Sequence, residues 1–171
     1  MEWKSTSKLK DGQTVQSISN IALLEEFQAP IFSLEMLEAI FGDAGKGRRI
    51  RSWGKTDDFS PHFLATRSGT PMHTDPRYPR YTWHLILHNG GYRIRGLADI
   101  EVPTLVPNTM YQLDTHSPHE VTIDQRLPQV NHYKLQMAID SKTPIPREIA
   151  AERILDYVAG QDIFEMMMRL K

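Results

Sequence analysis

The chain has 171 residues, 40% of them hydrophobic, which is enough to bury the core of one domain. With 20 basic and 21 acidic residues its formal net charge is −1, so there is no overall positive field to attract a nucleic acid. The absence of cysteine excludes disulfides, thiolate metal sites and a cysteine nucleophile.

The N-terminal part is expected to contain one edge strand, at residues 14–18, and two short helices within about 19–42. Ser19 or Asn20 can cap the first helix, whose apolar residues recur at near-helical spacing as far as Pro30. Ser33 opens the second, with Leu34, Leu37, Ile40 and Phe41 on one face. We expect both helices to pack outside a sheet, with their acidic residues in solvent.

A basic run at residues 46–55 carries five cations around Trp53. One interpretation is contact with an anionic substrate or a nucleic acid, with Trp53 available for stacking. The simpler interpretation is a solvated loop that leads into an edge strand, because Arg49 and Arg51 alternate with Ile50. The sequence leaves both open.

The region of about 60–140 is predicted to be β-structure throughout. Asn89-Gly90-Gly91 is a strong hairpin signal, so the strands on either side of it are expected to pair. Many short strands with regular turns favour a sandwich or a closed barrel over a parallel sheet. The expected strands are 62–66, 82–88, 92–97, 110–114, 120–123 and 132–139.

After Pro144 and Pro146 the pattern becomes helical, over about 146–171. Two apolar stripes, the second rich in methionine, are separated by Gly160. We expect these helices to cover the barrel or a partner subunit, in which case the protein is a homodimer. The chain is thus predicted to be a single, mainly β domain with flanking N- and C-terminal helices.

Three residues are candidate metal ligands: His73 and Asp75 in Pro71-Met-His-Thr-Asp75, and His119 in His116-Ser-Pro-His-Glu-Val121. Residues i and i+2 of an extended backbone point to the same side, so His73 and Asp75 can bind one ion. Two imidazoles and a carboxylate form the facial triad of non-haem Fe(II) enzymes, which leaves coordination positions for a co-substrate and O₂. The alternative is a turn in which the histidines are ordinary hydrogen-bonded residues that bind no metal.

Pro71–Asp140 resembles the aspartyl/asparaginyl β-hydroxylase family of Fe(II)- and 2-oxoglutarate-dependent oxygenases. The resemblance implies a double-stranded β-helix, which is a jelly-roll or cupin-like barrel. It also implies that His73, Asp75 and His119 are the catalytic iron ligands. The matching stretches are, in order, 72–75, 80–87, 92–95, 113–114, 119–121 and 133–140.

The same resemblance implies a cation for the far carboxylate of 2-oxoglutarate. The family has an arginine on a late strand; here the strand alignment puts Lys134 at that place, while Arg126 is closer in spacing. A guanidinium binds a carboxylate bidentately and an ammonium only as a point charge, and both residues stay candidates. His84 would lie beside the co-substrate, and Arg95 is a candidate clamp on a carboxylate. The alternative for His84 is an ordinary buried histidine that is hydrogen-bonded, and the alternative for Arg95 is a place on a solvated strand face.

The expected function is that of a dioxygenase that hydroxylates an unactivated C–H bond, in a peptidyl Asp or Asn or in an amino-acid-like small molecule. The alternative is a cupin-type isomerase or sugar-binding module without 2-oxoglutarate chemistry, and a non-catalytic relative comes third. No apolar leader or membrane-length run is present, so we expect a cytoplasmic protein with no membrane partner and no nucleic-acid partner.

Overall fold

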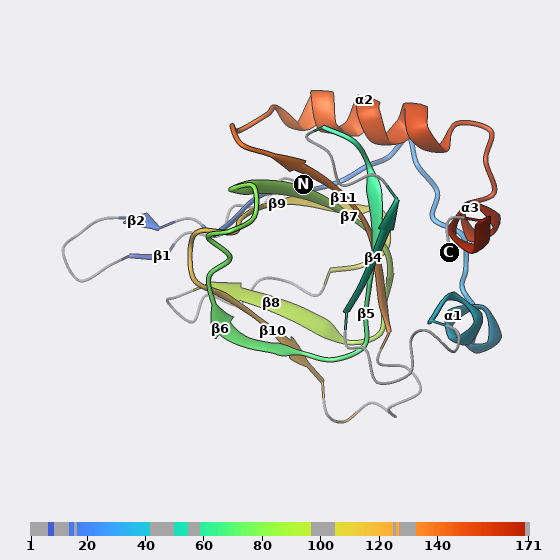
Figure 1. Cartoon of the computed structure of the whole chain (residues 1–171), viewed down its shortest axis with the longest axis horizontal. Coiled ribbons are helices and arrows are strands. Elements are labelled where there is room, and N and C mark those ends of the chain that lie inside the picture. The colour runs from blue at the N-terminus through green and yellow to red at the C-terminus, as the bar shows by residue number, and fades with distance from the viewer. Residues whose placement is uncertain are drawn as a thin grey trace.

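The computed structural model describes residues 17–41, 59–96, 105–124, 126 and 133–169, together with the backbone alone of 7–8, 14–15 and 50–54. This part of the chain is mainly β, with two antiparallel sheets that face each other and helices on the outside of the larger sheet (Figure 1). A further small hairpin pairs β1 (Ser7–Lys8) with β2 (Thr14–Val15).

Successive strands of the chain alternate between the two sheets. From β5 onward, odd-numbered strands belong to the larger sheet and even-numbered strands to the smaller one. The order in the larger sheet is β3 (Ile18–Leu23), β9 (Thr109–Asp114), β7 (Tyr81–Asn89), β11 (Lys134–Ser141), β5 (His62–Thr66) and β4 (Ile50–Gly54). The order in the smaller sheet is β6 (Thr70–His73), β10 (His119–Ile123) and β8 (Tyr92–Gly96).

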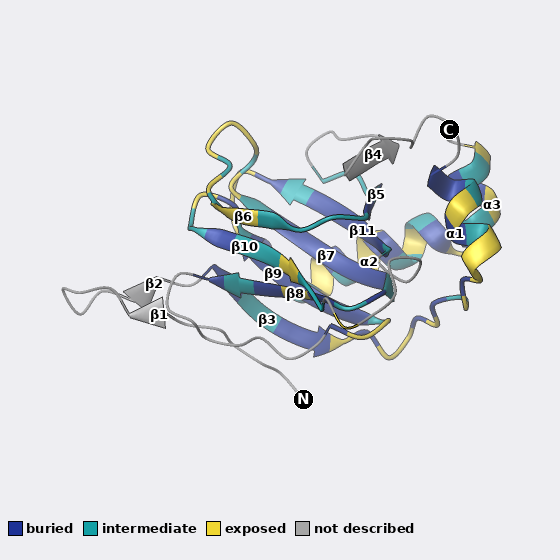
Figure 2. Cartoon of the chain, turned by 90° about the horizontal axis from the view of Figure 1, so that it is seen from below, coloured by how far each residue is buried: buried dark blue, intermediate teal, exposed yellow. Residues whose placement is uncertain are grey.

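The central strands of the larger sheet are buried on both faces and are dark blue in Figure 2. On the outer face Trp83, Leu85 and Met137 pack in one core with the helices. On the inner face Ile86 and Tyr111 pack with Ile94 of the smaller sheet, in the space that we call the interior. A strand buried on both faces needs apolar residues at successive positions, which explains the run of buried residues along β7.

Three helices cover the outer face: α1 (Leu34–Phe41), α2 (Arg147–Val158) and α3 (Ile163–Arg169) (Figure 1). Ser33 caps α1, because its hydroxyl accepts a hydrogen bond from the Met36 amide at 3.2 Å. The predicted helix after Ser33 and the two C-terminal helices are confirmed, and the buried methionines Met166 and Met167 belong to the outer core. No helix in the described residues is long and apolar enough to cross a membrane.

The helix predicted to follow Ser19 is wrong. Residues Ile18–Leu23 form strand β3, which pairs with β9 at the edge of the larger sheet. Asn20 has φ of 55° beside an irregularity in that pairing, and this kink gives the apolar residues a spacing that resembles a helical one. The pairing with β9 outweighs the local spacing of the apolar residues, so these residues form a strand and not a helix.

The predicted hairpin across residues 89–91 is also wrong. The turn forms, with Gly91 at φ of 97° and the Asn89 side chain accepting a hydrogen bond from the Tyr92 amide at 2.7 Å. It carries the chain from one sheet to the other, because β7 pairs with β9 and β11 while β8 pairs with β10. The turn residues predict a reversal of the chain and not the partner of the next strand.

The strands predicted within residues 60–140 are present, and in that region β6 was not predicted. Its short sequence Thr-Pro-Met-His is too brief and too exposed to show an alternating pattern. The edge strand predicted at residues 14–18 is not one element, because Thr14–Val15 form β2 and Ile18 begins β3. In the basic run, β4 is an edge strand as expected, but the side chains of this run, including Trp53, lie outside the described residues.

Candidate metal centre

The three predicted ligands come together where β6 and β10 pair. His119 lies opposite His73 in the register of these strands, and their ring centroids are 4.5 Å apart. Asp75 lies just beyond the end of β6, with its Oδ2 atom 3.4 Å from His73 Nε2 and 3.2 Å from His119 Nε2. One donor atom from each residue lies within 4.8 Å of the others, as one metal ion requires.

Hydrogen bonds to the backbone orient both imidazoles. His73 Nδ1 lies 2.6 Å from the Pro71 carbonyl oxygen, and His119 Nδ1 lies 2.8 Å from that of Ser117. A carbonyl oxygen can only accept, so in the neutral ring each Nδ1 carries the proton and donates it. The lone pair of each Nε2 is thereby left on the side of Asp75, which is the arrangement of a metal-binding histidine supported by its backbone.

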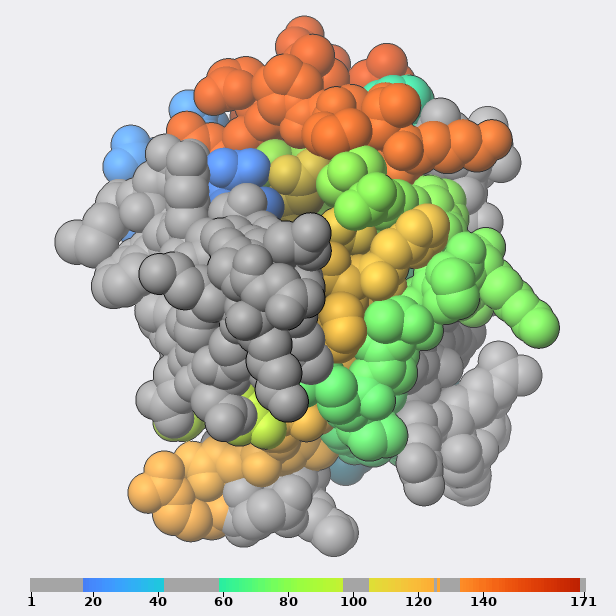
Figure 3. Space-filling view, turned by 90° about the vertical axis from the view of Figure 1, so that its left-hand side faces the viewer, coloured from blue at the N-terminus to red at the C-terminus, as the bar shows by residue number. Residues whose placement is uncertain are grey.

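The donor set fits a divalent transition metal of the kind that the 2-His-1-carboxylate motif binds. His119 is buried, whereas His73 and Asp75 are each about one-third exposed, so one side of the site is open to a ligand. His116, the nearby alternative, is exposed and lies outside the cluster, with its Nε2 3.1 Å from the Tyr78 carbonyl oxygen. In Figure 3 the green surface of residues near 70–80 borders the gold surface of residues near 115–120 at this end of the molecule.

His84 lies on the interior wall of the larger sheet and is neutral. Burial, and then the charges on Lys134, His62 and His119, lower its pKa well below the ordinary value. Gln136 Nε2 donates to the Tyr111 hydroxyl at 3.0 Å, and that hydroxyl lies 2.6 Å from His84 Nδ1 and donates to it. This relay leaves the proton of His84 on Nε2, where it is a neutral hydrogen-bond donor.

Lys134 also points into the interior, where its ammonium lies 5.2 Å from the ring centre of Tyr92 on the smaller sheet. The residue is 4% exposed, and burial lowers its pKa to about 8, so it is still mostly charged at neutral pH. Lys134 takes part in none of the ion pairs among the described residues. A buried ammonium that is charged and has no ion-pair partner among the described residues is suited to bind an anionic ligand.

The two arginines predicted to bind the co-substrate lie elsewhere. The side chain of Arg126 is 84% exposed and pairs with Asp124 at 2.9 Å, which lowers the pKa of that carboxyl to about 2. Arg95 pairs with Glu120, opposite it in the ladder, on the face of the smaller sheet that points away from the interior. The structure therefore brings neither of them together with His73, Asp75 and His119.

Several interior residues were missed from the sequence. His62 Nε2 lies 3.9 Å from Asp140, which accepts a hydrogen bond from Thr82 at 3.0 Å, and His62 Nδ1 is buried without a partner. Gln136 was missed as well, although Lys134, Gln136 and Asp140 share one face of a strand whose other face is apolar. Polar residues at every second position of a central strand could have indicated that these side chains face the interior.

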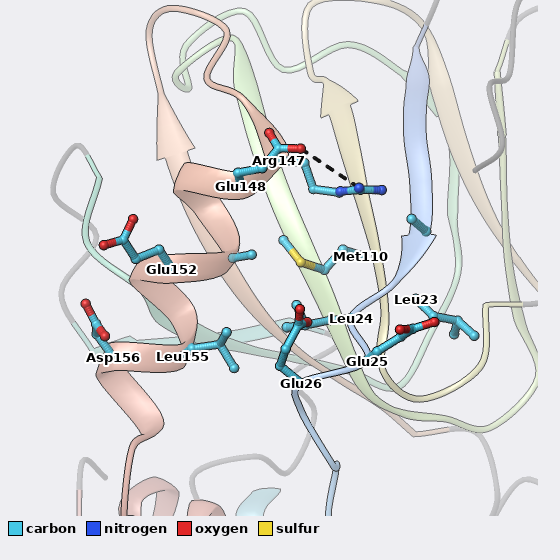
Figure 4. A pocket seen from close by; sticks show the side chains of 12 residues that line it. Leu23, Leu24, Glu25, Glu26, Met110, Arg147, Glu148, Glu152, Leu155 and Asp156 are labelled. Carbon is cyan, nitrogen blue, oxygen red and sulfur yellow. Dashed lines mark ion pairs between the residues drawn. The ribbon is translucent and has the colours of Figure 1, made fainter. Parts of the chain in front are cut away.

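A groove of about 640 Å³ lies on the outer face of the larger sheet, between α2 and the end of β3 (Figure 4). Its floor includes Leu24 and Met110, and its rim carries five carboxylates and Arg147, which lies 3.9 Å from Glu148. Because Met110 belongs to the outer core, the larger sheet separates this groove from the triad. The carboxylates are those of Glu25, Glu26, Glu148, Glu152 and Asp156.

Neither a protein-family model nor a curated protein sequence matches the chain. Among solved structures, the chain is similar to a cupin superfamily protein from Desulfitobacterium hafniense, with 14% sequence identity and a TM-score of 0.37. The match covers 56% of this chain and 80% of that protein.

Proposed function

We propose that this protein is an Fe(II)- and 2-oxoglutarate-dependent dioxygenase, of the aspartyl/asparaginyl β-hydroxylase type, that hydroxylates an unactivated C–H bond. The observation that carries the proposal is the convergence of His73, Asp75 and His119, with both Nε2 atoms beside one carboxylate oxygen. Two neutral imidazoles and one carboxylate are the donor set of this enzyme class, and they leave positions free for other ligands.

The arrangement of strands supports the proposal that the fold is a double-stranded β-helix. In such a fold successive strands alternate between two facing sheets, as β5 to β11 do here. The alternation places the ends of β6 and β10 side by side although they are distant in the sequence. This order brings the two candidate ligands that precede β7 next to the candidate ligand that follows β9, which supports the proposed metal centre.

His73, Asp75 and His119 would hold the ion. When bound, Fe(II) supplies the oxidation chemistry, in which O₂ is reduced as 2-oxoglutarate is decarboxylated and the substrate is hydroxylated. The backbone carbonyls of Pro71 and Ser117 hold the protons on the far nitrogens of the two rings, so that the near nitrogens stay available to the metal.

Lys134 is the residue that would pair with the far carboxylate of 2-oxoglutarate. Among the three predicted cations it alone is buried in the interior, and burying a charge is costly unless a counter-charge accompanies it. An ammonium binds that carboxylate as a point charge, without the bidentate geometry of an arginine. His84, with its proton on Nε2, would donate a hydrogen bond to an oxygen of the bound co-substrate.

The substrate is proposed to be a peptidyl Asp or Asn, or an amino-acid-like small molecule. The exposed sides of His73 and Asp75 leave the centre open towards solvent, which suits a substrate that approaches from outside while the co-substrate lies in the interior.

Anaerobic titration of the Fe(II)-loaded protein with 2-oxoglutarate tests the proposal. We expect a visible metal-to-ligand charge-transfer band that is present in the wild type, lost in His73→Ala and kept in the control His88→Asn. His88 contacts Phe32 on the outer side of the larger sheet, away from the triad. Metal binding without the band would favour a cupin-type protein with other chemistry, and no metal binding would favour a non-catalytic module.

A further inference from the structure

Two loops carry ligands of the candidate metal centre. Residues 74–80 join β6 to β7 and contain Asp75, while residues 115–118 join β9 to β10 and lead directly into His119. The β6–β10 ladder places His73 opposite His119, but Asp75 lies beyond the end of that ladder. The position of Asp75 relative to His119 therefore depends on contacts between the two loops.

Asp114, the last residue of β9, contacts both loops through its carboxylate. It accepts hydrogen bonds from Arg80 Nε at 3.2 Å and from Arg80 Nη2 at 3.0 Å, at the end of the first loop. It also accepts from the His116 amide and the Ser117 hydroxyl, each at 3.1 Å, within the second loop. The Asp114 side chain is 12% exposed, so these donors rather than water satisfy most of its charge.

Thr115 makes the second set of connections between the loops. Its carbonyl oxygen accepts a hydrogen bond from the Asp75 amide at 2.7 Å, which ties the backbone of the metal ligand itself to the second loop. Its own amide donates to the Arg80 carbonyl at 2.8 Å, and its hydroxyl donates to the Pro79 carbonyl at 3.0 Å. A movement of Thr115 would therefore displace Asp75.

We propose that Arg80, Asp114 and Thr115 form a loop clamp that positions Asp75 and His119 for metal binding, with Asp114 as the principal positioning residue. The inference rests on the metal centre of the proposed function. None of these three side chains contributes a donor atom to the candidate centre. They act through the two loops, in the way that outer contacts of metal sites orient the ligands and set the affinity.

The clamp lies between the two ligand loops and outside both hydrophobic cores. Asp114 and Thr115 are largely buried and Arg80 is half exposed, so the melting temperature of the metal-free protein is measured beside the metal affinity. Loss of an outer contact of this kind typically lowers metal affinity about 10–100-fold. We expect an effect of that size on the affinity for Fe(II).

The test measures Fe(II) affinity by anaerobic calorimetry, and the melting temperature of the metal-free protein, in wild type, Asp114→Asn and Arg80→Lys. Arg80→Lys keeps the positive charge but loses the paired hydrogen bonds, and its exposed site tolerates the change if Asp114→Asn folds poorly. Asp124→Asn is the matched control, because Asp124 makes paired bonds to Arg126 at 3.0 and 2.9 Å without contacting either ligand loop.

The clamp is supported if Asp114→Asn and Arg80→Lys lower the affinity about 10-fold or more while Asp124→Asn leaves it unchanged. It is overturned if the two clamp variants bind Fe(II) like wild type, or if Asp124→Asn weakens binding equally. His73→Ala separates the two proposals. Binding that His73→Ala abolishes but the clamp variants do not affect overturns the clamp alone, whereas no binding by wild type overturns both.

Discussion

Replacing Lys134 by methionine should stabilise the ligand-free protein. Burial lowers the pKa of Lys134 from 10.5 to about 8. At about 1.4 kcal/mol per pKa unit, keeping the ammonium charged in the interior therefore costs about 3 kcal/mol at neutral pH. Methionine has a similar length and no charge, although it loses the contact of the ammonium with the Tyr92 ring. We expect Lys134→Met to raise the free energy of unfolding at pH 7 by about 1–3 kcal/mol.

The pH dependence of this gain follows from the direction of the pKa shift. Between about pH 8 and 10.5 the unfolded chain holds the Lys134 proton while the folded protein has lost it. Since the unfolded state binds more protons there, wild-type stability rises with pH across that window, and the advantage of Lys134→Met should shrink. Below pH 8 both states are protonated and the advantage should be constant.

The assay is denaturant unfolding of wild type and Lys134→Met from pH 7 to 10.5, with and without 2-oxoglutarate in the metal-loaded protein. The co-substrate should stabilise the wild type more than the variant, since the variant lacks the cation for its far carboxylate. Lys142→Met is the matched control, because Lys142 is exposed. A variant that is less stable than wild type at pH 7, with a difference that does not change up to pH 10.5, would refute the reasoning.

Three further predictions concern the interior, the outer core and the metal centre. Tyr111→Phe removes the hydroxyl that bonds Gln136 and His84, and should cost about 0.5–1.5 kcal/mol in unfolding free energy, as measured by urea titration, because Gln136 Nε2 stays 3.3 Å from His84 Nδ1 and neither atom is left unpaired. Trp83→Ala deletes a fully buried indole whose N–H donates to a backbone carbonyl, and should cost about 3–5 kcal/mol; a loss below 1 kcal/mol in the same titration would contradict the packing described. Mn(II), used as an air-stable substitute for Fe(II), should raise the unfolding free energy by about 2.7 kcal/mol at 100 times its Kd. His119→Ala should abolish this gain in thermal unfolding, and an equal gain in that variant would place the metal elsewhere.

The sequence by itself determined most of the β-region, the three helices that form and the residues of the candidate centre. These are local properties. A strand needs a short run of suitable residues between turns, a helix begins at a capping residue such as Ser33, and His-x-Asp places two ligands on one side of an extended backbone. The three candidate ligands could be chosen from their residue types and their order, before any pairing of strands is known.

Only the tertiary structure decided which strands pair and which side chains face the interior. Residues 18–23 form a strand because β9 offers them hydrogen bonds, and the turn at residues 89–91 joins two sheets instead of closing a hairpin. The sequence leaves Lys134 and Arg126 both as candidates, yet Lys134 is buried in the interior and Arg126 is exposed, since the direction of a side chain depends on strand register. The loop clamp could not be predicted from the sequence for the same reason, because Arg80 and Asp114 meet only where β7 and β9 lie side by side.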